Sequence, residues 1–421
     1  MTRPSTAMRA AGLVLLGGLV LAVSSLAQDF PPEGLAAADA VVVSNAPSDP
    51  PWHQLVGPPA LLPAGDPAAD AFIGPALVAP FLLLGEQVKP GTRQRLQWSV
   101  SQGGFAGADS VTPVIVVHGT RPGPVLCLTA AVHGDELNGV EIIRRVVNQA
   151  DPAQFSGTLV AVPIVNLFGF SRNSRYLPDR RDLNRHFPGT RRGSIASRIA
   201  YSFFEGVVQH CEALVDFHTG SFDRSNLPQV RADLRLPEVL RFARGFGQLP
   251  VLHSNGTKGM LRLAATQAGI PSVTFEVGAP ATLEPKEIET GVRAIHALMH
   301  HLGMIGMAPG EQEPQAIFYD SQWVRANAGG LLISYVQLGE RVERGTRLGV
   351  VIDPILNVER EIVSPIIGRV IGIARNQVVL PGYAAFHLGE ATSAEQASDA
   401  AAASQDSPLE EEDPDPESRL E

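Results

Sequence analysis

The chain has 421 residues, of which 44% are hydrophobic and 18% are charged, and its formal net charge is −10. These values are typical of a globular protein with one large domain, or with a large and a small one, and they exclude a fibrous or a wholly disordered chain. The acidic balance also argues against nucleic acid as a partner.

The first 27 residues follow the pattern of a Sec-type secretory signal peptide. Arg3 and Arg9 precede an apolar run at 10–23, and Ser25-Leu26-Ala27 forms a small-x-small cleavage site. We predict cleavage after Ala27 and export to the periplasm. The apolar run is shorter than the roughly 20 residues that cross a bilayer, although an uncleaved anchor stays an alternative. Cleavage would leave 31 basic and 43 acidic residues, a net charge of −12.

Two further segments lack the pattern of a folded domain. Residues 28–86 are rich in Pro and Ala without a sustained period, which predicts an extended arm to which no chemistry is assigned. Residues 391–421 carry ten acidic side chains against Arg419, and we expect this acidic tail to be disordered.

Residues 87–308 show strands alternating with helices. Short apolar runs predict strands, and a period near 3.6 predicts helices. In chain order we expect strands at 96–100, 114–117 and 125–132, a helix at 137–147 and a strand at 158–165. A long polar loop follows, and after it a helix at 194–208 and a strand at 213–217. The alternation continues through 260–267, 272–277 and a helix at 284–302. The pattern predicts an α/β domain with a parallel core, whose site lies at the carboxyl ends of the strands.

Residues 311–390 have a different texture. The helical period vanishes, and short Val, Ile and Leu stretches are separated by single or paired glycines. This pattern predicts a second, all-β domain.

The chain has only two cysteines, Cys127 and Cys211. Two are too few for a disulfide framework and for a thiolate zinc site. Both lie beside apolar runs, so we expect buried packing rather than a bridge between them.

Three residues at strand ends have the chemistry of a metal centre. His133 and Glu136 directly follow the strand at 125–132, and His218 directly follows the strand at 213–217. A His-x-x-Glu pair is a weak signal alone, and its place at the carboxyl end of a strand strengthens it. Two histidines and one carboxylate are zinc ligands that leave a fourth position open. We therefore predict one Zn²⁺ per chain.

Further polar residues surround this predicted centre. Glu276 ends a third strand, and a carboxylate beside a metal that is not a ligand can act as general base and then as acid. The polar loop is rich in arginine, and a cluster of cations beside a metal suggests an anionic substrate. These arginines are Arg172, Arg175, Arg180, Arg181, Arg185 and, just beyond the loop, Arg191.

These residues and the string Asp182-Leu183-Asn184-Arg185 together resemble the succinylglutamate desuccinylase/aspartoacylase family of carboxypeptidase-like zinc hydrolases, over about residues 90–388. The resemblance implies a zinc-carboxypeptidase-like mixed sheet flanked by helices. It implies the following roles: zinc ligands His133, Glu136 and His218; base and acid Glu276; oxyanion and substrate contact Arg175; and substrate carboxylate binding by Asn184 and Arg185.

The C-terminal segment resembles the barrel-sandwich fold of lipoyl and biotinyl carriers. Carrier domains are modified on a lysine at a hairpin tip, whereas the matching turn at 354–357 has none and no lysine follows Lys286. We therefore expect no lipoyl or biotin attachment and a structural or substrate-shaping role.

Other polar residues have plainer interpretations. Asp216 lies two residues before His218 and either orients it or is a structural carboxylate. Asp179 and Asp182 are expected to hold the arginines of the loop. His296 and His300 are four apart on a predicted helix, and an exposed pair is favoured over a metal site.

The sequence thus favours an exported zinc-dependent amidohydrolase, or deacylase, that cleaves an amide bond of an N-acyl amino acid or a similar carboxylate-bearing substrate. One alternative is a zinc carboxypeptidase acting on cell-wall or other peptides. Another is a non-catalytic binding protein with the same fold. The acyl group and the oligomeric state stay open.

Overall fold

The computed structural model describes residues 78–100, 110–306, 315–375 and 377–390. The predicted signal peptide, most of the segment 28–86 and the acidic tail lie outside these ranges. None of the helices in the described ranges is long and apolar enough to span a membrane.

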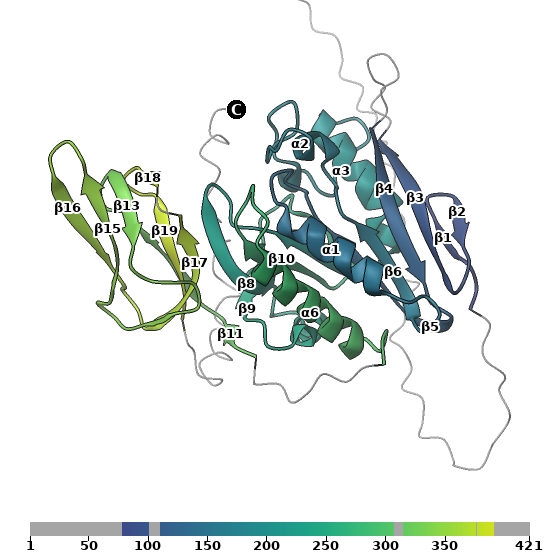
Figure 1. Ribbon diagram of the computed structural model, residues 1–421. Coiled ribbons are helices and arrows are strands. Elements are labelled where there is room, and N and C mark those ends of the chain that lie inside the picture. The colour runs from purple at the N-terminus through teal and green to yellow at the C-terminus, as the bar shows by residue number, and fades with distance from the viewer. Residues whose placement is uncertain (1–77, 101–109, 307–314, 376, 391–421) are drawn as a thin grey trace, which may run out of the picture. The chain divides into compact units, whose positions relative to one another are not determined.

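Most strands of the described residues join one mixed sheet of thirteen strands (Figure 1). Its main path runs β12-β19-β17-β8-β10-β7-β5-β6-β4-β3, and β9, β11 and β14 pair beside this path. The strands are β3 (Thr92–Val100), β4 (Ser110–His118), β5 (Arg121–Thr129), β6 (Ser156–Val162), β7 (Ala213–His218), β8 (Arg224–Ala232), β9 (Val251–His253), β10 (Ser272–Gly278), β11 (Ile317–Phe318), β12 (Ser321–Arg325), β14 (Arg341–Val342), β17 (Gly368–Ala374) and β19 (Ala384–Glu390).

The centre of this sheet is parallel. β5 pairs in parallel with β6 and β7, and β7 pairs in parallel with β10. β4 and β8 flank this core in antiparallel orientation, which makes the sheet mixed. Strands that are covered on both faces read as continuous apolar runs, and this is why their sequences predicted them. Their carboxyl ends meet at one edge, where the predicted site residues lie.

Helices cover both faces of the sheet. α1 and α6 run side by side on one face with α4, and α3 and α5 pack on the other (Figure 1). The helices are α1 (Asn138–Gln149), α2 (Leu167–Phe170), α3 (Ile195–Gly206), α4 (Pro237–Ala243), α5 (Leu261–Gln267) and α6 (Pro285–His301), with short 3₁₀ turns at η3 (Leu183–Arg185), η4 (Val208–His210) and η5 (Arg244–Phe246). A hairpin of β1 (Phe81–Leu83) and β2 (Glu86–Val88) adds Leu83 and Val88 to the buried hydrophobic core that includes the apolar side chains of α3.

The sequence of α6 explains its limits and its packing. Pro285 stands at the first turn, where its missing N–H costs nothing, and Gly303 follows the end of the helix with a φ of 71°. Ile288, Val292 and Ile295 form the predicted apolar stripe and are buried against the sheet.

The C-terminal strands form two sheets rather than a closed barrel within the described residues. β13 (Gly330–Ser334), β15 (Arg347–Asp353), β16 (Val358–Val363) and β18 (Val378–Val379) form a four-stranded sheet, whereas β12, β14, β17 and β19 belong to the large sheet. The two sheets enclose a core that includes Leu332, Val351 and Phe386. The expected all-β character is confirmed, but the barrel closure is not, because β17 pairs with β8 of the large sheet.

The expectation for the cysteines is wrong. Cys127 and Cys211 are buried as expected, but they form a disulfide that spans 84 residues of sequence. Cys127 lies on β5, and Cys211 lies just before β7. The parallel pairing of these neighbouring strands brings the two side chains together.

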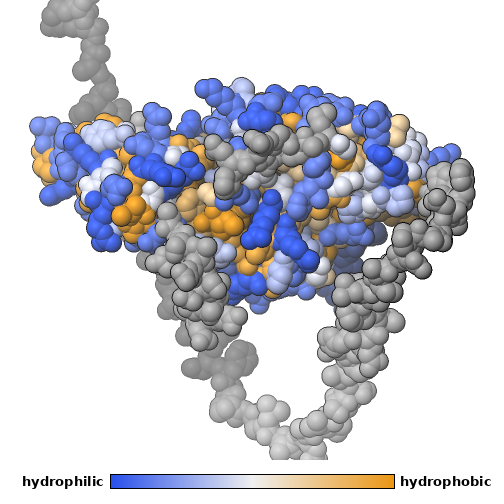
Figure 2. All heavy atoms as spheres, turned by 90° about the horizontal axis from the view of Figure 1, so that it is seen from below, coloured by the Kyte–Doolittle hydropathy of each residue, from blue (hydrophilic) through white to orange (hydrophobic). Residues whose placement is uncertain are grey.

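Large hydrophobic side chains that remain exposed are frequent in the C-terminal strands and turns. Ile355 is 90% exposed and Leu380 is 74% exposed. On the face shown in Figure 2, hydrophobic side chains form separate orange patches among blue hydrophilic ones. Scattered exposure of this kind is normal for a folded protein and assigns no partner.

Candidate active site

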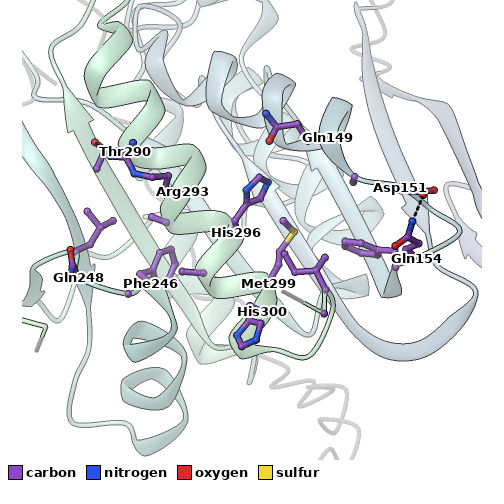
Figure 3. Close-up of a pocket in the computed structure, with 18 of the residues that line it drawn as sticks. Gln149, Asp151, Gln154, Phe246, Gln248, Thr290, Arg293, His296, Met299 and His300 are labelled. Carbon is purple, nitrogen blue, oxygen red and sulfur yellow. Dashed lines mark hydrogen bonds between the residues drawn. The ribbon is translucent and has the colours of Figure 1, made fainter. Parts of the chain in front are cut away.

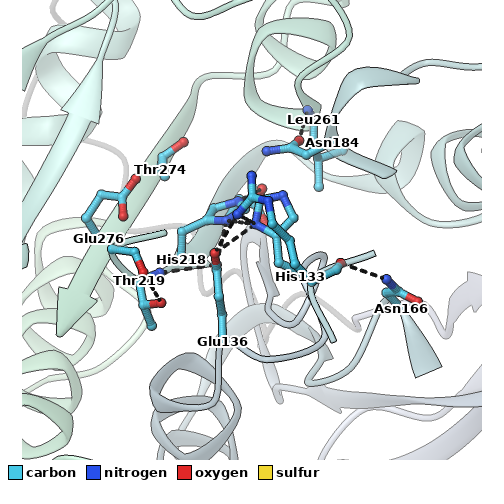
Figure 4. Close-up of polar contacts among 12 residues, drawn as sticks. His133, Glu136, Asn166, Asn184, His218, Thr219, Leu261, Thr274 and Glu276 are labelled. Atoms are coloured by element: carbon cyan, nitrogen blue, oxygen red, sulfur yellow. Dashed lines mark hydrogen bonds and ion pairs between the residues drawn. The ribbon is translucent and has the colours of Figure 1, made fainter. Parts of the chain in front are cut away.

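Three side chains that can bind a metal meet at the carboxyl edge of the parallel strands. His133 and Glu136 follow β5, and His218 ends β7, so the pairing of these strands sets their separation. One ligand atom from each of the three lies within 4.8 Å of the other two, and all three residues are buried. Figure 4 shows the three side chains converging on one point. The structure thus brings together the predicted ligands.

Each histidine is held through its Nε2 atom and turns its Nδ1 atom to the centre. His133 Nε2 lies 3.0 Å from Asp182 Oδ1, and His218 Nε2 lies 2.8 Å from Asp216 Oδ2. A carboxylate only accepts hydrogen bonds, so each Nε2 donates. This is the usual support of a metal-binding histidine. Asp216 therefore lies where it can orient His218, which is one of the two roles that the sequence predicted for it.

The inner atoms of the group need a positive charge between them. His133 Nδ1 lies 2.9 Å from Glu136 Oε1, and His218 Nδ1 lies 2.8 Å from Glu136 Oε2. The two Nδ1 atoms are 3.1 Å apart. In a neutral ring whose Nε2 carries the proton, Nδ1 is an acceptor, so it faces another acceptor here. Arg175 donates to His133 Nδ1 and Glu136 Oε1, and ring protons or a metal cation would satisfy the remaining acceptors. The donor set fits a metal.

The electrostatics of the group agree with this geometry. Burial opposes charge on both histidines, yet Asp216 and Glu136 hold the pKa of His218 well above its usual value. The pKa of His133 is also raised, against burial and Arg175, by Glu136 and Asp182. Burial raises the pKa of Glu136, but the two histidines outweigh it and lower that pKa below its usual range. A cation at this place is strongly favoured.

Arg175 is fixed beside the three ligands. One guanidinium nitrogen lies 3.1 Å from His133 Nδ1 and 3.2 Å from Glu136 Oε1, and the other donates to Asp182 Oδ2 at 2.9 Å. Asp182 therefore supports an arginine, as expected, and supports His133 as well. Its pKa lies well below the usual value because His133 and Arg175 outweigh the effect of burial.

Asn184 and Arg185 are presented by the short turn η3. Asn184 is buried, and its Oδ1 accepts a hydrogen bond of 2.8 Å from the backbone N–H of Leu261 at the start of α5. Asp182 caps the turn by accepting from the Asn184 N–H. Arg175, Asn184 and Arg185 line the same cavity. The other predicted arginines of the loop are not among its lining residues, and Arg181 pairs with Asp179 instead.

Glu276 lies beside His218 at the edge of the sheet. The two residues are register partners on the neighbouring strands β10 and β7. Glu276 is buried and lines the cavity without belonging to the metal-binding group. In the view of Figure 4, Glu276 lies to the left of the histidines and Asn184 lies above them.

The cavity that joins these residues has a volume of about 800 Å³. Its wall includes Trp323, Arg325 and Tyr383 from the C-terminal strands, together with Arg224 and Arg231 of β8. The Arg224 guanidinium stacks on the rings of Trp323 and Tyr383 at 5.1 and 4.7 Å. The C-terminal segment thus helps to shape the site, as the sequence allowed.

Comparison with known proteins agrees with this geometry. Residues 122–302 match the profile of the succinylglutamate desuccinylase/aspartoacylase catalytic domain. This part of the chain belongs to the succinylglutamate desuccinylase/aspartoacylase family. The matched residues contain the three side chains that can bind a metal, and also Arg175 and Glu276.

One curated relative and several solved structures resemble the chain. The N-α-acetyl-L-2,4-diaminobutyric acid deacetylase of Halomonas elongata is 27% identical over 271 residues, which are 61% of this chain and 79% of that protein. A succinylglutamate desuccinylase from a Silicibacter species aligns with a TM-score of 0.64 at 22% identity, covering 75% of this chain and 98% of the other. The ectoine utilization protein EutE (DoeB) of Ruegeria pomeroyi aligns with a TM-score of 0.64 at 22% identity, covering 74% of this chain and 98% of the other. These structures show that the fold of the desuccinylase/aspartoacylase family extends over most of the described residues.

Several residues that line the active-site cavity could not be identified from the sequence. Asn226 and Arg231 lie on β8, where polar side chains face the cavity and hide the strand pattern. Trp323, Arg325 and Tyr383 come from a segment more than 100 residues beyond the metal ligands. No short motif marks them, so only the pairing of β17 with β8 reveals their place.

A second cavity lies away from the candidate active site. It has a volume of about 1300 Å³ and is lined by α6, the end of α1 and the turn around Phe246 (Figure 3). His296 and His300 both border it and are half-buried rather than exposed. No metal-binding group of three side chains includes them among the described residues. This cavity therefore receives no assigned role.

Proposed function

We propose that this protein is a zinc-dependent hydrolase of amide bonds that acts on an N-acyl amino acid or a similar small carboxylate-bearing molecule. The observation that carries the proposal is the His133–Glu136–His218 group inside a cavity that also holds Glu276. Two histidines and one carboxylate are a common ligand set of catalytic zinc. When bound, zinc polarises a carbonyl and lowers the pKa of coordinated water.

Glu276 is suited to carry the proton. It is buried beside the ligands, and a carboxylate in such a place can remove a proton from water and return it to the departing amine. A binding protein would need no such group. The presence of Glu276 with all three ligands therefore favours an enzyme over a non-catalytic protein of the same fold.

Arginines give the cavity its preference for anions. Five of them line it, against the two acids Glu136 and Glu276, and the five are Arg175, Arg185, Arg224, Arg231 and Arg325. Arg175 is held rigidly beside the ligands and can stabilise negative charge on the oxygen of the attacked amide. Asn184 and Arg185 line the same cavity and are our candidates for binding a substrate carboxylate.

The related enzyme of Halomonas elongata supports deacylation in particular. Its name describes the removal of an acetyl group from an amino acid. We therefore rank an N-acyl amino acid ahead of a peptide as substrate, and a zinc carboxypeptidase is the second candidate. Both substrates carry a carboxylate on the amine side of the amide, and the two differ in the acyl side: a deacylase accepts a short acyl group, whereas a carboxypeptidase requires a peptide.

Metal analysis tests the centre of this proposal. The purified protein should contain about one zinc per chain. His133→Ala and His218→Ala should each lose it, because each removes one of three ligands. His210→Ala changes an exposed histidine that neither belongs to the three-residue group nor lines the cavity, and it serves as the matched control. Elemental analysis of the wild type and the three variants measures the zinc content per chain.

Activity on defined substrates completes the test. Hydrolysis of N-acetyl-L-aspartate, N-acetyl-L-glutamate and N-acetyl-L-2,4-diaminobutyrate is followed by release of the free amine. Chelation should abolish the activity, and added Zn²⁺ should restore it. A folded protein that neither contains nor accepts metal would overturn the zinc mechanism and leave the binding-protein alternative.

We also propose that the mature protein works outside the cytoplasm. The N-terminal pattern and the Cys127–Cys211 disulfide both support export, because such bonds persist in oxidising compartments. When the full chain is produced in a Gram-negative host, N-terminal sequencing of the periplasmic fraction should start at Gln28. A full-length N-terminus confined to the cytoplasmic fraction would contradict export.

A further inference from the structure

Asn226 makes a direct contact with the proposed catalytic carboxylate. It lies on β8, is 4% exposed, and donates from Nδ2 to Glu276 Oε2 at 3.0 Å. The two residues are not opposite each other in the β8–β10 pairing, because Asn226 pairs with Gly278 and Glu276 pairs with Gln229. The contact is therefore made by the side chains and depends on the asparagine amide.

Strand β17 of the C-terminal segment packs closely against the same amide. Gly372 of β17 is the register partner of Asn226. A Cβ atom at Gly372 would lie 2.8 Å from Asn226 Oδ1 and 3.1 Å from the Cβ of His387. Only a residue without a side chain fits beside the amide without moving it. Gly372 thus leaves Asn226 room to point its Nδ2 at Glu276.

We infer that Asn226 is a positioning residue for Glu276, and that the absence of a side chain at Gly372 keeps Asn226 in place. The C-terminal strands thereby help to orient the catalytic carboxylate. The inference rests on the proposed function, in which Glu276 carries the proton. A glutamate has several rotatable bonds, and a hydrogen bond from a buried amide to a carboxylate fixes its orientation. General-base action needs that orientation, because a displacement of about 1 Å can cost about 100-fold in rate.

A purely structural role for Asn226 would predict something different. β8 and β17 are also joined by Gln229, whose buried side chain donates from Nε2 to the Ile371 carbonyl at 3.1 Å. Gln229 is not among the residues that line the cavity. Gln229 is the register partner of Glu276 in the β8–β10 pairing, but its side-chain amide bonds to Ile371 of β17. Gln229→Ala therefore weakens the same junction between strands and keeps the Asn226–Glu276 hydrogen bond, so it is the matched control.

The experiment compares four variants of the zinc-loaded protein on whichever N-acetyl amino acid of the panel the wild type hydrolyses fastest. Asn226→Ala removes the donor, and Asn226→Asp keeps the shape but replaces the donor with an acceptor. Both should lower kcat by about 10- to 100-fold with KM within about twofold of wild type. Gly372→Ala should lower kcat in the same direction, because the amide must move. Gln229→Ala should leave kcat within about twofold of wild type, even if its melting temperature falls.

Crystal structures of the variants supply a readout that does not depend on turnover. In Asn226→Ala and Asn226→Asp the Glu276 carboxylate should turn away from its wild-type position, while zinc content stays unchanged. An unmoved carboxylate with unchanged kcat overturns the inference, as does an equal loss of kcat in Gln229→Ala. If Asn226→Ala does not fold, Asn226→Asp and Gly372→Ala decide. If the wild type shows no hydrolysis, the proposed function fails, and the position of Glu276 alone decides the positioning role.

Discussion

Replacing Glu276 with glutamine should lower kcat by about 10²- to 10⁴-fold, which is the range for loss of a general acid–base group. Glutamine keeps the shape of the side chain, and its amide oxygen can still accept the hydrogen bond from Asn226. It cannot take a proton from water. Because Glu276 is not part of the metal-binding group, zinc content should stay at about one per chain. Steady-state kinetics and elemental analysis on the same preparation measure both quantities.

The control for this change is Glu284→Gln. Glu284 lies close to the end of β10 and accepts a hydrogen bond of 2.7 Å from the Ala279 N–H, but it does not line the cavity. Its replacement should leave kcat within a few fold of wild type. Wild-type turnover in Glu276→Gln would exclude Glu276 as the base. Loss of zinc in that variant would instead make it a ligand.

Replacing both Cys127 and Cys211 with alanine should lower the free energy of unfolding by about 4 to 5 kcal/mol. The bond closes a loop with a sequence separation of 84 residues, and the entropy of the unfolded chain that it removes grows with loop length. Urea unfolding of the oxidised wild type and of the double variant, both without metal, measures the difference. Metal is removed first because its binding would stabilise the folded state.

Reduction of the wild type gives an independent comparison. The reduced wild type should unfold at nearly the urea concentration of the double variant, since both lack the cross-link. A thiol assay on the denatured oxidised protein should find no free cysteine. Equal unfolding midpoints for oxidised wild type and double variant would show that the bond does not stabilise the fold.

The parallel core and its ligands were predictable because their physics is local. The strands that lead to His133, His218 and Glu276 are buried on both faces, so each appears in the sequence as a largely apolar run. A polar residue directly after such a run lies at the carboxyl edge of the sheet. The sequence therefore predicted which side chains would meet, although not the distances between them.

β8 could not be predicted in the same way. Its buried positions include Asn226 and Gln229, and Pro228 stands in its middle, a residue type that argues against a strand in the sequence. These polar side chains are buried against other polar groups of the site and of β17, which no local pattern reveals. The disulfide has a similar explanation, because Cys127 and Cys211 become neighbours only through the pairing of β5 with β7.

The shared edge of β8 has a consequence for any shortened version of this protein. β9 covers residues Val230–Ala232 of that edge, and β17 covers Arg224–Asn226. A fragment that stops near residue 308 would keep every metal ligand but would leave the first part of β8 with unpaired backbone groups. Exposed strand edges of this kind pair with other chains and promote aggregation. We therefore expect the family-matched region to aggregate when it is expressed alone, and the C-terminal strands to prevent this in the full chain.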